Sequence, residues 1–238
     1  MEGKLEYGYE IAGRYVYRKA LGSGACGSVF LAYDRKISKL WAVKMCENIR
    51  GYEAEALKKI DHCAFPRIVD VCEQDKAVFL VMDYVEGESL GKYCRNHAVS
   101  QRQILIWCRK IAEAIEYLHN MTPSLLYMDC KPDNIMLTTA GEIRLVDLGS
   151  IYVKNDDISN IVSGTEFFAP EEITKYSLHK LEYTPDERSD IYSLGMTMYT
   201  LLTGCRVEYR DRYGNICARR QNKNISRVTE QIIRKCCC

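Results

Sequence analysis

Two short segments hold the residues best suited to chemistry, Asp129-Cys130-Lys131-Pro132-Asp133-Asn134 and Val146-Asp147-Leu148-Gly149. A carboxylate such as Asp129 can accept the proton of an attacking hydroxyl, and an ammonium such as Lys131 can hold a phosphoryl group. The oxygens of Asn134 and Asp147 suit Mg²⁺. The D-x-K-P-x-N spacing fixes four residues and is rare by chance, which disfavours an acidic turn without function. The pattern predicts phosphoryl transfer to a hydroxyl.

A glycine-rich segment lies upstream, with the sequence Leu21-Gly22-Ser23-Gly24-Ala25-Cys26-Gly27-Ser28-Val29. Glycines let the backbone approach phosphate groups and aim N–H groups at them. The same spacing opens dinucleotide sites, but a helix follows there, whereas a strand pattern follows here. Lys44 lies on a later strand, in Trp41-Ala42-Val43-Lys44, from which it can reach the α- and β-phosphates. The alternative is a solvated lysine on an ordinary strand.

The elements that position these residues change in type along the chain. Alternating and β-branched patterns predict strands at 15–20, 29–32, 40–45, 68–72 and 77–82, with one short helix at 52–60. After residue 87, helical spacing predicts helices at 103–119, 191–202 and 226–236, and two short strands at 135–137 and 143–146. The last helix is expected to carry Val228, Ile232 and Ile233 on one face. The sequence therefore predicts an α+β fold, with a β-rich N-lobe and an α-helical C-lobe.

Composition narrows the class of protein. The chain has 238 residues, of which 47% are hydrophobic and 27% charged, with a net charge of +1. This is ordinary globular composition, and it gives no reason to expect a nucleic-acid partner. No apolar run approaches the length of a membrane span, and the first residues are too polar for a signal peptide. The 12 cysteines form no Cys-x-x-Cys pair, which favours reduced thiols in a cytoplasmic protein.

Taken in order, these motifs resemble the signature set of the protein kinases. Ala169-Pro170-Glu171 is similar to the end of the family's activation segment, and Asp190-Ile191-Tyr192-Ser193-Leu194-Gly195 to the start of its central C-lobe helix. Gly13-Arg14-Tyr15 and Ala32-Tyr33-Asp34 resemble the eukaryotic-like serine/threonine kinases of bacteria. The resemblance implies an N-lobe at 14–82, a hinge at 83–87 and a C-lobe at 88–238 that is short at its C-terminus.

The resemblance also implies a set of site residues, with ATP and Mg²⁺ as cofactors and Ser/Thr-bearing proteins as substrates. The catalytic residues would be Asp129 as base, with Lys131, Lys44 and Glu53. The Mg²⁺ ligands would be Asn134 and Asp147. The nucleotide would contact Leu21, Gly22, Ser23, Gly24, Ala25, Cys26, Gly27, Ser28, Val29, Ala42, Lys44, Met82, Asp83, Val85 and Met136.

Some positions depart from the family pattern. Tyr127 replaces the usual His, and Met128 replaces an Arg that receives a phosphorylated loop residue in many kinases. We therefore expect little control by loop phosphorylation. Glu53 is expected to pair with Lys44, although the spacing is short and a solvated helix charge is the alternative. The Thr165 hydroxyl is expected to contact Asp129 or Lys131 directly.

Two other functions remain open at this stage. One is a pseudokinase-like scaffold that binds nucleotide and is inactive because its C-lobe is short. Retention of Lys44, Asp129, Asn134 and Asp147 argues against it, since a scaffold needs none of them. The other is a small-molecule phosphotransferase on a related fold. The Lys131-Pro132 pair and the 169–171 segment favour a protein substrate instead.

Overall fold

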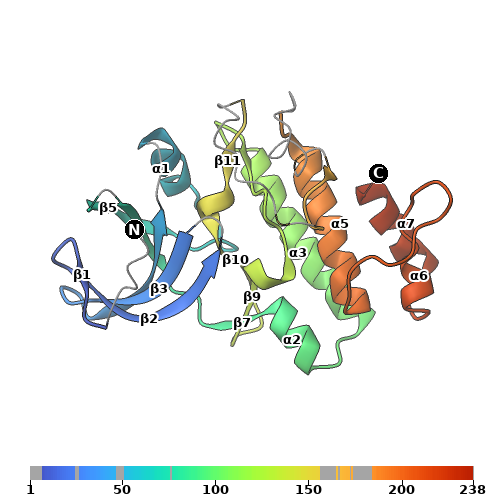
Figure 1. Ribbon diagram of the computed structural model, residues 1–238, viewed down its shortest axis with the longest axis horizontal. Helices are drawn as coiled ribbons and strands as arrows, with labels where there is room; N and C mark the ends of the chain where they lie inside the picture. Colours follow the sequence, from blue (N-terminus) through green and yellow to red (C-terminus); the bar gives the residue numbers. More distant parts are fainter. Residues whose placement is uncertain are drawn as a thin grey trace. The chain divides into compact units, whose positions relative to one another are not determined.

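The computed structural model describes residues 7–24, 27–46, 51–75, 77–155, 165, 167–171, 173 and 184–237, with the backbone alone at residues 23, 24 and 51–53. The chain divides into two compact units, unit 1 at Met1–Glu86 and unit 2 at Gly87–Cys238. Among the described residues, unit 1 has one sheet and one helix, and unit 2 has two small sheets and several helices (Figure 1).

Unit 1 is built on one six-stranded antiparallel sheet with the strand order β1-β2-β3-β4-β6-β5. Its elements are β1 (Glu10–Ile11), β2 (Tyr15–Gly24), β3 (Gly27–Asp34), β4 (Lys39–Cys46), α1 (Gly51–Lys58), β5 (Ile68–Gln74) and β6 (Ala77–Asp83). Apolar side chains from both β-branched and aromatic residues fill its core, namely Ile11, Tyr15, Phe30, Ala32, Trp41, Val43, Phe79 and Val81. The predicted strands and helix of this part are confirmed, and β1 was not predicted.

Unit 2 is mainly helical, and α3 and α5 lie side by side in it (Figure 1). Its helices are α2 (Leu90–Asn96), α3 (Gln101–His119), α5 (Glu187–Thr203), α6 (Ala218–Gln221) and α7 (Arg227–Cys236), with the 3₁₀ helices η1 (Pro132–Asn134) and η2 (Leu148–Ser150). Two small sheets complete it, in the orders β10-β9-β7 and β11-β8. Their strands are β7 (Gly87–Ser89), β8 (Leu125–Leu126), β9 (Ile135–Thr138), β10 (Ile143–Leu145) and β11 (Tyr152–Val153).

Side-chain caps begin the long helices of unit 2. The Ser100 hydroxyl accepts the Gln103 N–H at 3.2 Å at the start of α3, and Asp186 accepts the Arg188 N–H at 2.9 Å at the start of α5. These bonds satisfy N–H groups that have no partner within the helix. The buried residues of α3 recur every three or four positions, so one face packs on the core. The three predicted long helices are confirmed.

The C-terminal helix α7 differs from the prediction in one respect. Ile233 is fully buried, whereas Val228 and Ile232 are 65% and 41% exposed. The expectation that all three share a face was wrong for Ile233, because five residues of helix turn it about 140° away from Val228. Among the described residues, no helix is both long and apolar enough to span a bilayer.

Candidate active site

Asp129 lies at the centre of a hydrogen-bonded cluster in unit 2. Its Oδ2 accepts a bond from Lys131 Nζ at 2.8 Å, and its Oδ1 accepts one from the Thr165 hydroxyl at 2.7 Å. Lys131 Nζ also donates to Thr165 Oγ1 at 2.6 Å. The ammonium of Lys131 and the hydroxyl of Thr165 together hold the Asp129 carboxylate in one orientation. The carboxylate is also nearly buried, since Asp129 is only 7% exposed. The predicted contact of Thr165 with Asp129 and Lys131 is confirmed.

Asn134 packs directly against Asp129. Its Nδ2 donates to the Asp129 backbone oxygen at 3.0 Å and to Asp129 Oδ2 at 2.7 Å. Both partners are acceptors, so the hydrogen-bond network assigns the orientation of the amide. The amide oxygen Oδ1 of Asn134 therefore faces away from Asp129. In this orientation the oxygen can bind a cation that lies beside the base.

The backbone brings Asp147 next to Asn134. The Val146 N–H donates to the Asn134 carbonyl oxygen at 2.9 Å, and the strands β9 and β10 that flank these residues are paired. Asp147 has φ 66° and ψ 62°, a left-handed conformation that costs an ordinary residue about 1–2 kcal/mol. Aspartate is among the residues that adopt it most often. The two predicted Mg²⁺ ligands thus lie on adjoining segments.

Tyr127 contacts both the Asn134 segment and the segment of Val146 and Asp147 through its hydroxyl group. Its hydroxyl donates to the Val146 carbonyl oxygen and lies 3.5 Å from the Asn134 carbonyl oxygen. Burial raises the pKa of the Tyr127 phenol well above its usual range, and the nearby Cys130, Asp147 and Asp129 raise it further. The phenol therefore stays protonated and keeps donating. The residue that replaces the family's usual His performs a positioning role through its hydroxyl.

Asp190, at the start of α5, fixes the backbone just before Asp129. Its carboxylate is fully buried and accepts the N–H groups of Tyr127 at 2.8 Å and Met128 at 2.7 Å. His119 Nε2 lies 2.8 Å from the same carboxylate. Met128 has φ 66°, so these bonds hold a strained residue in place. The sequence matched Asp190 to a family motif but gave it no role, because its bonds reach residues more than sixty positions away.

The donor set fits a magnesium ion that takes some of its ligands from water and phosphate. Asn134 and Asp147 offer oxygen atoms, which hard cations prefer. Among the described residues, no group of three or more His, Cys, Asp and Glu side chains is arranged to hold a metal. Mg²⁺ needs no such cage, because one or two protein oxygens together with substrate phosphates suffice. The residues present therefore fit the predicted ion.

The glycine-rich segment of unit 1 forms the end of the β2–β3 hairpin. Gly22 pairs with Val29, Ser23 with Ser28 and Gly24 with Gly27. Gly27 has φ 112°, and a Cβ there would lie 2.0 Å from the Met45 carbonyl oxygen. Only glycine fits such a position.

The side chain of Ser23 and the predicted contacts Ala25 and Cys26 lie outside the described residues. Leu21 is 40% exposed, on the strand that leads into the hairpin.

Lys44 lies on β4 of the same sheet, opposite Val29 on β3 and Leu80 on β6. It is 1% exposed, which is rare for lysine and excludes the alternative of a solvated strand residue. Glu53 falls within α1. The side chain of Glu53 lies outside the described residues, so its pairing with Lys44 stays a prediction.

The residues predicted to contact adenine are distributed over both units. In unit 1, Ala42 pairs with Met82 across β4 and β6, and both are buried. Asp83 ends β6, and its carboxylate accepts Arg67 Nε at 2.9 Å. Val85 follows and is partly buried. In unit 2, Met136 lies on β9 opposite Ser89 of β7. Their roles remain predictions.

Met128 belongs to an apolar cluster with Leu126, Tyr152, Ala169 and Ile173. Leu126 is on β8, and Tyr152 is on β11, which pairs with it. The cluster therefore joins the first part of the 147–171 segment to its last part. At the position where many kinases carry a phosphate-binding Arg, this chain has a hydrophobic contact.

Comparisons with known proteins agree with this geometry. The family model described as "Protein kinase domain" matches residues 15–238. The chain is 31% identical to the serine/threonine-protein kinase WNK8 of Arabidopsis thaliana over 93% of its own length and 40% of the relative's. It is 27% identical to the ovarian-specific serine/threonine-protein kinase Lok of Drosophila melanogaster, over 90% of this chain and 48% of Lok.

A bacterial relative is similar to the same degree. The serine/threonine-protein kinase PrkC of Bacillus subtilis is 28% identical over 83% of this chain and 31% of its own length. The predicted resemblance to serine/threonine kinases, bacterial ones included, is confirmed. The chain spans less than half the length of these relatives.

Proposed function

Because the chain belongs to the protein kinase family, we propose that it transfers the γ-phosphate of ATP to serine and threonine hydroxyls of proteins. The observation that carries this proposal is the cluster of Asp129, Lys131, Thr165 and Asn134. Protein kinases use ATP, typically with Mg²⁺. Asn134 and Asp147 would hold a bound Mg²⁺, which would offset the negative charge of the phosphates.

The residues of the cluster have distinct roles in this proposal. Asp129 accepts the proton of the acceptor hydroxyl while the hydroxyl oxygen forms a bond to the γ-phosphorus. The bond between that phosphorus and the ADP oxygen breaks in the same step. Lys131 offsets the charge of the transferred group. Thr165 positions both, because its hydroxyl touches each of them. Removal of the proton and stabilisation of the phosphoryl group are thus assigned to neighbouring side chains.

Unit 1 supplies the nucleotide contacts in this proposal, apart from Met136, which belongs to unit 2. The hairpin from Leu21 to Val29 covers the phosphates, and Lys44 binds their α and β oxygens with Glu53 orienting it. Ala42, Met82, Asp83, Val85 and Met136 surround the adenine. The proposed organisation is an N-lobe at 14–82, a hinge at 83–87 and a C-lobe at 88–238. Burial of Lys44 supports a binding role for this lysine, since a lysine without such a role is usually exposed.

The acceptor is proposed to be serine or threonine of a protein, and the chain itself is proposed to be cytoplasmic. Lys131, two residues after Asp129, resembles the serine/threonine class, and the relatives named above carry that description. The scaffold alternative is not favoured by any feature of the described residues, because the Asp129 cluster is intact.

The proposal is tested by incubating the purified chain with labelled ATP, Mg²⁺ and a mixture of dephosphorylated casein and histone. We expect label in protein, with phosphoserine and phosphothreonine on acid hydrolysis. Asp129→Asn is the matched control, and it should reduce labelling by about a hundredfold or more.

Two results would contradict the proposal. Labelling that the Asp129→Asn protein matches would mean that Asp129 is not the base or that another enzyme in the preparation is responsible. Binding of Mg-ATP without any label transfer would favour the scaffold alternative.

A further inference from the structure

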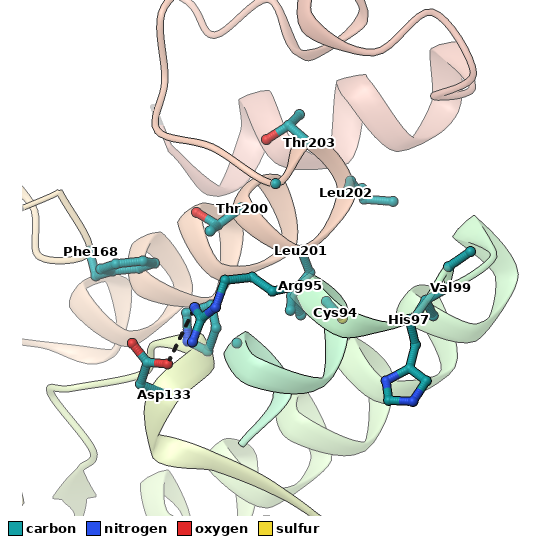
Figure 2. Close-up of a pocket in the computed structure, with 14 residues that line it drawn as sticks. Cys94, Arg95, His97, Val99, Asp133, Phe168, Thr200, Leu201, Leu202 and Thr203 are labelled. Atoms are coloured by element: carbon teal, nitrogen blue, oxygen red, sulfur yellow. Dashed lines mark ion pairs between the residues drawn. The ribbon is translucent and has the colours of Figure 1, made fainter. Parts of the chain in front are cut away.

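A groove in unit 2 lies between α2, η1, Phe168 and the end of α5 (Figure 2). Its volume is about 510 Å³, enough for a few side chains of a peptide. Figure 2 shows Arg95 of α2 extending toward Asp133 and Phe168. The residues of α5 that line the groove carry no charge. The hydroxyls of Thr200 and Thr203 donate to carbonyl oxygens of the helix itself. What the groove recognises therefore depends on its other walls.

Two lining residues of the groove, Asp133 and Phe168, lie close to the proposed base Asp129. Asp133 belongs to the same short segment as Asp129, and the Phe168 N–H donates to the Thr165 carbonyl oxygen at 3.0 Å. The Thr165 side chain in turn touches Asp129. A chain whose hydroxyl reaches Asp129 would therefore have flanking residues close to Asp133 and Phe168. The groove is suited to residues that flank the acceptor.

Asp133 is the one carboxylate among the described residues that line the groove. Its Oδ1 lies against the backbone of α2, where a Cβ at Gly91 would approach it to 2.4 Å. The same oxygen lies 4.0 Å from Arg95 Nη1, and the two side chains are 65% and 66% exposed. Such a long, solvated pair is weak. Arg95 can therefore bind another carboxylate with little loss of interaction energy, while water solvates the Asp133 carboxylate.

A second guanidinium lies next to Phe167, the residue before Phe168, although it is not among the described residues that line the groove. Arg206 is exposed, and its Cζ lies 4.0 Å from the centre of the Phe167 ring, in the range of a cation–π contact. Phe167 has φ 76°, which is strained for a bulky residue and presents its ring at the surface. Arg95 thus lines the groove and Arg206 lies beside Phe167, while Asp133, the one carboxylate among the described lining residues, already faces Arg95.

We propose, on the premise of the function above, that this groove binds the substrate peptide beside its acceptor residue and that Arg95 and Arg206 select acidic side chains there. An aspartate or glutamate of the substrate would replace Asp133 on Arg95 or approach Arg206. A lysine or arginine would meet two like charges and a carboxylate that is already partnered. Discrimination arises from the repulsion as much as from the attraction.

The test uses three peptides with one serine acceptor in an alanine–glycine background, flanked by aspartates, alanines or arginines. For the wild-type chain we expect kcat/KM for the acidic peptide to exceed that for the basic peptide by about tenfold. Arg95→Ala and Arg206→Ala should each lower the acidic-to-neutral ratio by about threefold or more. Arg95→Glu should move the preference toward the basic peptide.

Arg109→Ala is the matched control. Arg109 is an exposed arginine of α3 that pairs with Glu113 at 3.2 Å and does not line the groove. It should leave the acidic-to-neutral ratio unchanged. Thermal unfolding of each variant checks that the exposed substitutions leave the fold intact.

The outcomes separate this inference from its premise. Phosphorylation of the neutral peptide with a preference for arginine, or with a ratio that neither Arg95→Ala nor Arg206→Ala changes, overturns the acidic selectivity and leaves the kinase activity standing. No phosphorylation of any peptide contradicts the proposed function. In that case the charge preference is decided by binding, measured as the fluorescence anisotropy of labelled forms of the same peptides. Tighter binding of the acidic peptide than of the basic peptide supports acidic selectivity in the groove. Equal or weaker binding of the acidic peptide rejects it.

Discussion

The glycine hairpin of unit 1 and the Asp129 cluster of unit 2 are constructed in opposite ways. The hairpin is defined by its backbone, through the pairing of Gly22 with Val29 and Gly24 with Gly27. The cluster is defined by side chains, since Asp129 is held by Lys131 and Thr165. The hairpin therefore depends on shape, and the cluster depends on the chemical type of each residue.

This difference predicts different responses to mutation. In the hairpin, a substitution matters where a Cβ has no room, whatever its chemistry. In the cluster, an isosteric change that removes one charge or one hydroxyl is enough, because each atom has an assigned partner. The predictions below test this contrast.

The largest expected effect belongs to the two aspartates of unit 2. Asp129→Asn and Asp147→Asn should each lower kcat by about a hundredfold or more, because one removes the base and the other a Mg²⁺ ligand. Only Asp147→Asn should also weaken binding of Mg-ATP, measured by calorimetry. Near-normal turnover of Asp129→Asn on a protein substrate would refute the assignment of the base.

Gly27→Ala should be the most damaging small change in the hairpin. Its φ of 112° and the 2.0 Å approach to the Met45 carbonyl oxygen leave no place for a methyl group. We expect a loss of about 1–3 kcal/mol in the stability of the chain, together with weaker ATP binding. Gly22→Ala is the matched control for stability, because nothing lies within 4 Å of a Cβ there. Equal melting temperatures for the two variants would contradict the argument from shape.

Thr165→Ala should have an intermediate effect. It removes the hydroxyl that joins Asp129 to Lys131, so we expect kcat to fall by about tenfold, equivalent to 1.4 kcal/mol. Thr165→Ser keeps the hydroxyl and should retain most of the activity. If both variants lose activity equally, the methyl group and not the hydrogen bonds would account for the loss.

Much of the fold was predictable because local patterns agree with it. The spacing of Ile104, Trp107 and Ile111 gave α3, and apolar runs gave β4 and β6, whose buried residues match. Elements of two residues, such as β8 and β11, were not predicted, because only pairing with a distant segment defines them. α2 has seven residues, too few for a clear helical period.

The site was predictable to the extent that residue types reveal chemistry. Asp129, Lys131 and Asn134 were chosen from their spacing, and the structure brings them together. The role of Asp190 was not predicted, because its bonds to Tyr127 and Met128 cross more than sixty residues of sequence. The burial of Lys44 likewise depends on strands that flank it in space. Long-range contacts of this kind leave no local signal.

The smallest expected effect concerns phosphorylation of the 147–171 segment. Met128 cannot pair with a phosphate, and it packs instead with Tyr152, Ala169 and Ile173. Lys154 is the one basic residue of the segment, and its ammonium is bound to Glu187 at 2.5 Å. That bond lowers the pKa of the Glu187 carboxyl, so Glu187 is a carboxylate at neutral pH. A new phosphate would find little positive charge within the segment.

We therefore expect phosphatase treatment to change kcat by no more than a few-fold, which corresponds to less than about 1 kcal/mol of transition-state stabilisation. Ser159→Ala and Ser163→Ala, at positions outside the described residues, should behave in the same way. Thr165→Ala is unsuitable for this purpose, because its hydroxyl contacts Asp129 and Lys131. A hundredfold loss that phosphorylation restores would show that a basic residue from elsewhere receives the phosphate. The apolar contacts of Met128 would then be insufficient to keep the 147–171 segment in its active position. Regulation of this segment would then depend on the chemical type of specific residues, as the Asp129 cluster does, and not on packing alone.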